Sequence, residues 1–256
     1  MSRRNKLLIA LGLATLTIIA GLYAKTIYFD NKQTATTNDM GLLDIFKKSS
    51  TPYKNEAINL IYNLLFCDNL DLYKQNSQKP NIYPWDILFA DSSSSDDLQK
   101  IINDTTTEPR MKVLAYNKLI SSGHKIDKKD LLAVIVEVGL DSGLDVVASF
   151  KNGTARYINY TGSMIVWETT DEKSNALTAE LFRNSENVVK QIGVWDKPRR
   201  PAPTKGNVRI TFLVSDGLYF GEGPMNVLFN DPLASPALNS ATALMQYMME
   251  KSSEQK

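Results

Sequence analysis

The residues of this 256-residue chain that could do chemistry are mostly carboxylates. Asp216 and Glu222 enclose the segment DGLYFGE, and two acids that converge could bind Mg²⁺ or exchange protons with a substrate. Aspartates in turns, however, often only accept hydrogen bonds from their own backbone. The sequence therefore leaves a carboxylate-dependent enzyme that uses Asp216 and Glu222 as one alternative, while our first expectation is a chain with no catalytic residue.

Other catalytic groups are scarce. His124 is the only histidine and Cys67 the only cysteine, so neither a zinc site built from several such ligands nor an internal disulfide is possible. The chain contains no glycine-rich nucleotide loop and no nucleophile motif. Its net charge of +1 provides no basic surplus for nucleic acid. We therefore predict no cofactor, no metal and no nucleic-acid partner.

A glycine-rich segment with two aromatic residues suits contact with a ligand or partner. In SDGLYFGEGP, residues 215–224, three glycines surround Tyr219 and Phe220. Glycine allows close approach of the backbone, and aromatic rings supply contact area. The same segment also fits a tight hairpin whose aromatic side chains return to the core, and the sequence leaves both interpretations open.

The loop KPRRPAPTKG, residues 197–206, is the second candidate for contact. It carries Arg199 and Arg200 on a proline-rich backbone that resembles a polyproline helix. Such a segment suits an acidic partner or lipid head groups. It fits equally well a solvated connection between a helix and a strand.

Residues 7–24 are uncharged and mostly apolar, and as a helix they would span about 27 Å, close to the thickness of a bilayer. Three basic residues precede this run and two follow it nearby. The positive-inside rule then places the N-terminus in the cytoplasm and the body on the outer or periplasmic side of a bacterial envelope. Leu22 is a poor residue for the −3 position of a cleavage site, so we predict an uncleaved transmembrane signal anchor over residues 1–25.

Residues 26–51 form a predicted tether that includes the short amphipathic helix MGLLDIFKK. Part of this helix could lie in the membrane interface, with the contact residues Leu42, Leu43, Phe46 and Lys47. The helix could instead pack on the domain. A third alternative makes Met40 the true start of a soluble cytosolic protein.

Residues 52–256 predict a single α+β domain. Apolar residues at helical spacing dominate residues 52–124, where the first helix is expected to have Thr51 as its N-cap. From Leu131 onward, β-branched runs separated by tight turns indicate an antiparallel meander. We therefore predict a helical part followed by a sheet part, 130–256, with four to six antiparallel strands and helices packed on one face.

The first hypothesis for function is a single-pass, membrane-anchored accessory module that binds a protein partner and has no chemistry of its own. It depends on the predicted anchor and on the missing catalytic motifs. Its expected contact residues are Asp216, Tyr219, Phe220, Glu222, Arg199 and Arg200. The alternatives are the carboxylate-dependent enzyme and a soluble cytosolic accessory or immunity-type protein that starts at Met40. The sequence leaves the oligomeric state open.

Overall fold

The computed structural model describes residues 51–78, 80–168 and 171–254. The predicted anchor, the tether and the alternative start at Met40 lie outside these residues. So do the expected interface residues Leu42, Leu43, Phe46 and Lys47. Within the described part of the chain, no helix is long and apolar enough to cross a membrane.

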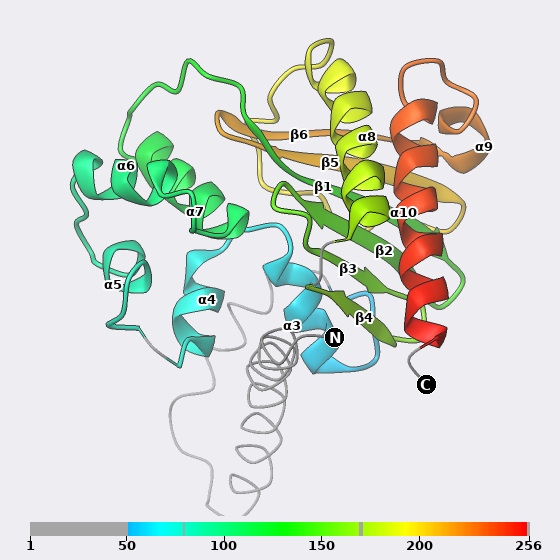
Figure 1. The fold of residues 1–256 in the computed structure, drawn as a ribbon, viewed down its shortest axis with the longest axis horizontal. Helices are drawn as coiled ribbons and strands as arrows, with labels where there is room; N and C mark the ends of the chain where they lie inside the picture. The colour runs from blue at the N-terminus through cyan, green and yellow to red at the C-terminus, as the bar shows by residue number, and fades with distance from the viewer. Residues whose placement is uncertain (1–50, 79, 169–170, 255–256) are drawn as a thin grey trace, which may run out of the picture.

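Six antiparallel strands form one sheet in the order β4-β3-β2-β1-β5-β6 (Figure 1). Their bounds are β1 Leu131–Leu140, β2 Gly143–Phe150, β3 Ala155–Ile158, β4 Met164–Trp167, β5 Asn207–Val214 and β6 Gly217–Pro224. The first four follow one another as the predicted meander. The chain then crosses the sheet through a long helix and returns on the other side of β1, so β1 is central and β4 and β6 are the edges.

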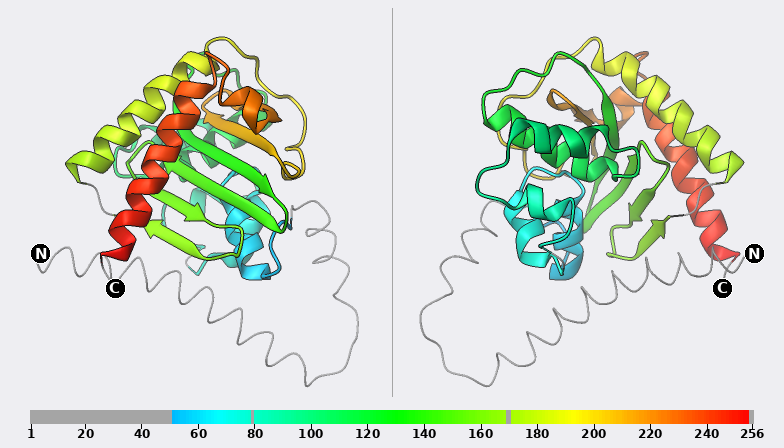
Figure 2. Two further views of the ribbon diagram at one scale, coloured as in Figure 1. Left: turned by 90° about the vertical axis from the view of Figure 1, so that its right-hand side faces the viewer. Right: turned by 60° about the vertical axis from the view of Figure 1, so that its left-hand side comes forward.

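Helices cover both faces of the sheet (Figure 2). One face carries the helices that precede the sheet, which are α3 Glu56–Leu64, α4 Leu70–Asn76, α5 Trp85–Leu88, α6 Ser95–Asn103 and α7 Pro109–Ser121. The other face carries α8 Glu172–Val189 and α10 Ser235–Ser253, and the short α9 Met225–Leu228 follows β6. The predicted α+β class and antiparallel sheet are confirmed, whereas the prediction of helices on one face is wrong.

The residues of β1 explain why two helical layers are needed. Successive side chains of a strand point to opposite faces. Ile135 belongs to the core under α3–α7, whereas Val134 and Val136 belong to the core under α8 and α10. A strand that is apolar at both parities is buried on both sides. Each face of the sheet therefore requires its own helices.

The helical part differs from the prediction in its boundaries. The first helix begins at Glu56, with Asn55 rather than Thr51 as its N-cap, because the Asn55 side chain accepts a hydrogen bond from the backbone of Ala57. Before it, the backbone N–H of Tyr53 donates to Asn59 Oδ1 at 2.9 Å, which ties the segment to the helix without a helical backbone. Two short helices, α4 and α5, occupy a stretch that the sequence suggests is a looser connector.

Candidate functional site

A row of three charged residues crosses the central and edge strands. Glu137 on β1 lies directly opposite Arg209 on β5, and Arg209 lies directly opposite Glu222 on β6. Directly opposed residues share a face of the sheet, which here is the face that α3 covers. Arg209 donates to Glu222 Oε2 from Nη2 at 2.7 Å and from Nε at 2.9 Å. Its Nη1 lies 3.7 Å from Glu137 Oε2, so one guanidinium serves two carboxylates.

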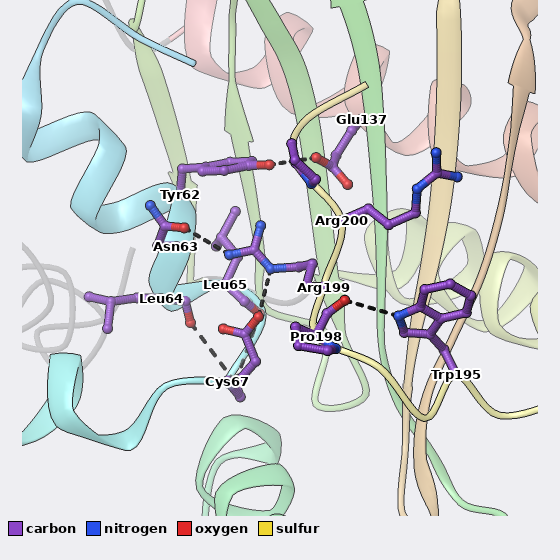
Figure 3. Close-up of polar contacts among 12 residues, drawn as sticks. Tyr62, Asn63, Leu64, Leu65, Cys67, Glu137, Trp195, Pro198, Arg199 and Arg200 are labelled. Atoms are coloured by element: carbon purple, nitrogen blue, oxygen red, sulfur yellow. Dashed lines mark hydrogen bonds and ion pairs between the residues drawn. The ribbon is translucent and has the colours of Figure 1, made fainter. Parts of the chain in front are cut away.

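Glu137 is completely enclosed at the inner end of this row. The hydroxyl of Tyr62, from α3, donates to Glu137 Oε1 at 2.6 Å (Figure 3). No described residue donates a hydrogen bond to Oε2. Burial raises the pKa of the Glu137 carboxyl, and the nearby charge of Arg209 and the Tyr62 hydrogen bond oppose that rise. Glu137 is thus a buried acid whose proton affinity is increased.

The predicted contact loop, residues 197–206, is fastened onto this row. Arg209 Nη1 donates to the carbonyl of Arg200 at 3.1 Å, and Nη2 donates to the carbonyl of Pro201 at 2.5 Å. Gly139 of β1 lets the loop approach closely, because an added Cβ would lie 2.2 Å from the carbonyl oxygen of Thr204. The loop is therefore part of the folded structure and does not project freely into solvent.

Arg199 links the loop to α3 and the residues that follow it. Its Nε donates to Asp68 Oδ2 at 2.6 Å, and its Nη2 donates to Asn63 Oδ1 at 2.8 Å. The guanidinium carbon lies 3.9 Å from the centre of the Phe66 ring, within cation–π range. Only 10% of the side chain is exposed. Arg199, predicted as a contact residue, is thus committed to contacts within the protein.

Arg200 faces the other way and remains available. In Figure 3, Arg199 points toward α3 and Arg200 points away from it. The Arg200 side chain is 53% exposed, and its Nη1 lies 3.6 Å from Glu222 Oε2. This is a long ion pair to a carboxylate that Arg209 already binds more closely. Arg200 can therefore take a second acidic partner at little cost in internal contacts.

Two aromatic rings lie near Glu222, the carboxylate that Arg200 reaches, because Phe220 is two residues before Glu222 on the same face of β6. The indole of Trp195 donates to the carbonyl of Pro198 at 3.0 Å and meets the ring of Phe220 edge to face, with 5.0 Å between ring centres. Lys197 Nζ lies 5.5 Å from the Trp195 ring centre. All of these side chains are at least partly exposed. We call the group formed by Trp195, Lys197, Arg200 and Phe220 the aromatic–cationic surface.

Asp216 and Glu222 are not brought together. Asp216 lies in the turn between β5 and β6, where its Oδ2 accepts a hydrogen bond from the hydroxyl of Tyr219 at 2.8 Å. Glu222 lies six residues further along β6, roughly 20 Å away for an extended chain, and binds Arg209. Among the residues that the structure describes, no group of three or more His, Cys, Asp or Glu side chains could hold a metal ion.

The two aromatic side chains of β6 lie on opposite faces of the sheet, because successive side chains of a strand point to alternate faces. Tyr219 is 1% exposed and belongs to the core under α8 and α10. Phe220 points to the other face and joins the aromatic–cationic surface. The segment 215–224 is therefore a tight hairpin, and it returns one of its two rings to that core.

Sequence reasoning missed Arg209, Tyr62 and Trp195 as members of this region. A signal for Arg209 was present, because a charged residue inside the apolar strand VRITFLV must have a buried partner. The identity of that partner depends on which strands lie beside β5, and the sequence does not reveal this.

Comparison with known proteins gives no family for this chain: no family model, no curated protein and no solved structure matches it. The interpretation of the site therefore depends on its own geometry.

Proposed function

We propose that the protein is a non-enzymatic accessory module that binds a protein partner and is held at a membrane by residues 7–24. The observation that carries this proposal is the aromatic–cationic surface beside β6. Tryptophan and arginine are over-represented among residues that dominate binding energy at protein interfaces. Here Trp195 is partly exposed and Arg200 is exposed, and Arg209 holds the loop backbone through the carbonyls of Arg200 and Pro201. A rigid surface loses little entropy when a partner binds.

The hydrogen bonds of Asp216 and Glu222 within the protein favour a binding function over a catalytic one. Glu222 accepts two hydrogen bonds from Arg209, and Asp216 accepts one from Tyr219. An acid–base pair or a Mg²⁺ site needs carboxylates that converge on a substrate. The two acids that the enzyme hypothesis requires are instead committed to separate structural contacts. No observation favours that second function.

Photocrosslinking in cells tests the proposal. Benzoylphenylalanine would replace Lys197, which lies on the aromatic–cationic surface, and in a matched control it would replace Lys125, an exposed residue after α7. We expect a light-dependent product of discrete mass from position 197 of the full-length protein, and none from position 125. The same set of products from both positions, or no product from position 197, would contradict a specific partner at this surface.

A further inference from the structure

The outer edge of β6 has backbone groups that the sheet does not use. In an antiparallel pair, residues that exchange hydrogen bonds alternate with residues that direct their N–H and C=O groups away from the neighbouring strand. Val214 and Gly217 flank the two-residue turn and pair with each other, so they exchange backbone hydrogen bonds. Every second residue of β6 repeats this arrangement, so Tyr219 and Gly221 also direct their N–H and C=O groups toward β5. It follows that Leu218 and Phe220, and likewise Glu222, direct their N–H and C=O groups outward.

Two hydrogen bonds outside the strands support this assignment. The backbone N–H of Trp195 donates to the carbonyl of Leu218 at 2.7 Å, as expected if Leu218 points outward. At the far end, the N–H of Met225 donates inward to the carbonyl of Gly206 at 2.9 Å, which fits the opposite parity. No hydrogen bond from outside β5 reaches the outward groups of Phe220 or Glu222 within the described chain.

The open edge is short and has defined ends. At one end Trp195 already pairs with Leu218 as a single antiparallel bridge. At the other end Pro224 has no N–H to offer. Between them, Phe220 and Glu222 offer two donors and two acceptors, enough for an extended segment of a few residues. Such unused donors and acceptors are what strand addition requires, the mode in which a peptide adds to a sheet edge.

The two faces of this edge differ in what they would offer to the side chains of an added strand. On one face, the aromatic–cationic surface provides Arg200 and Lys197. On the opposite face, the buried Tyr219 is followed by Gly221 and Gly223, and an added Cβ on Gly221 would come no closer than 3.9 Å to its nearest neighbour. A large apolar side chain therefore has room over the glycines, next to Leu228 of α9, which lies 3.6 Å from the Cβ position of Gly223.

The basic side chains beside β6 indicate that the partner segment is acidic. The segment 197–206 contains four basic residues and no acid. Arg199 and Lys205 are paired with Asp68 and Asp141. Arg200 has only the long ion pair to Glu222, which Arg209 binds more closely, so Arg200 and Lys197 are the basic side chains beside the edge that an acidic partner can reach. A second copy of this chain is disfavoured, because pairing of two β6 edges through Phe220 and Glu222 would place Arg200 and Lys197 of both copies on the same face of the joint sheet.

We propose that an extended, acidic segment of a protein partner adds to β6 as a seventh strand, with acidic side chains toward Arg200 and an apolar side chain over Gly221. This inference depends on the proposed function and specifies the partner's chemistry. The added strand pairs with the outward backbone groups of Phe220 and Glu222 and continues the bridge that Trp195 begins at Leu218.

Fluorescence polarisation with two labelled, capped peptides tests it on the full-length chain in detergent. One peptide alternates glutamate with isoleucine, and its matched control alternates lysine with isoleucine. The protein variants are Phe220→Ala, Phe220→Pro and Arg200→Glu, with Lys125→Glu as a charge-matched control far from the edge. Phe220→Ala and Phe220→Pro both remove the ring, but only proline also removes the outward N–H. Circular dichroism checks that each variant is folded.

We expect the glutamate peptide to bind at least about tenfold more tightly than the lysine peptide, in line with the loss of a charge-assisted contact. Phe220→Pro should bind roughly fivefold or more weakly than Phe220→Ala, since it lacks one strand hydrogen bond. Arg200→Glu should abolish the preference for glutamate, and Lys125→Glu should keep it.

Equal affinity for the two peptides, no binding, or equal loss in the alanine and proline variants would overturn the inference. A dimer seen by light scattering that Phe220→Pro dissociates would assign the edge to a second copy instead. If photocrosslinking at position 197 finds a partner while the peptides fail, the proposed function stands and only the acidic strand is rejected. If both fail, the binding function is rejected as well.

Discussion

Arg209 is the residue on which the charged row depends. Its side chain is 2% exposed and reaches Glu222, Glu137 and two loop carbonyls. Removing one member of a buried ionic group leaves its partners desolvated and unpaired, so Arg209→Met should lower the free energy of unfolding by about 3–5 kcal/mol. Urea denaturation of the full-length chain measures this. Lys128→Met, at an exposed ion pair with Asp130, should change stability little. Equal losses would contradict the role of Arg209.

Glu137 should make stability depend on pH. Folding raises the pKa of this carboxyl above its ordinary value of 4.5, so the folded state binds its proton more tightly than the unfolded state. The free energy of unfolding should therefore fall as pH rises from 4.5 through the folded pKa, and the loss should be complete above it. Glu137→Gln cannot ionise and should lack this fall, so its stability relative to wild type should improve with pH. Parallel urea-denaturation curves against pH would rule this out.

Among the elements, strand β1 determines the path of the loop 197–206, because the loop backbone packs directly against Gly139 of β1. A methyl group at this position would meet the backbone of Thr204, so Gly139→Ala should displace the loop. Trypsin measures the displacement at the Arg199–Arg200 and Lys205–Gly206 bonds, since the other two basic residues of the loop, Lys197 and Arg200, precede proline. We expect cleavage there to be roughly tenfold faster than in wild type, by mass spectrometry. Gly193→Ala has open space and should cleave like wild type. An unchanged cleavage rate in Gly139→Ala would contradict this packing.

Most strands could be predicted from the sequence because their signals are local. The run LLAVIVEVG predicts a buried strand, and β1 covers it; the predicted meander matches β2, β3 and β4. The error about helices on one face has its cause in the same run. Its apolar residues occupy both parities, which indicates cover on both faces. Helices on one face alone would leave one of these apolar parities exposed.

The site could be predicted only in part because its contacts are non-local. Arg199, Arg200 and Phe220 were identified from loop composition, and Arg200 and Phe220 lie together on one surface. The row through Glu137 and Arg209, however, exists only because β5 lies beside β1 with one particular register. Register depends on packing across the whole sheet, so no local pattern could reveal this row.

At the scale of the whole molecule, the sheet lies between two helical layers and exposes one strand edge beside a positively charged loop. The two layers bury both faces, so the candidate site must lie at the rim of the sheet. If the body faces the outside of the membrane, as the charge pattern of the first residues predicts, this rim would meet partners in the envelope.

Deleting residues 1–25 tests the membrane placement. The truncated chain should move entirely to the soluble fraction, because the only long apolar segment in the sequence has been removed. Fractionation of cells that express both forms with a C-terminal reporter measures this. Membrane association that survives the deletion would point instead to Leu42, Leu43 and Phe46 as the contact with lipid.

Hydrogen exchange tests the open edge of β6 most directly. In the isolated full-length chain, the amides of Phe220 and Glu222 point outward, whereas those of Tyr219 and Gly221 point toward β5. We predict that the first two exchange roughly a hundredfold faster than the second two, as measured by NMR. Such alternation along a single strand would show that β6 is ready to accept another strand. Equal protection of all four amides would mean that the edge is already covered, and would contradict the proposed binding site.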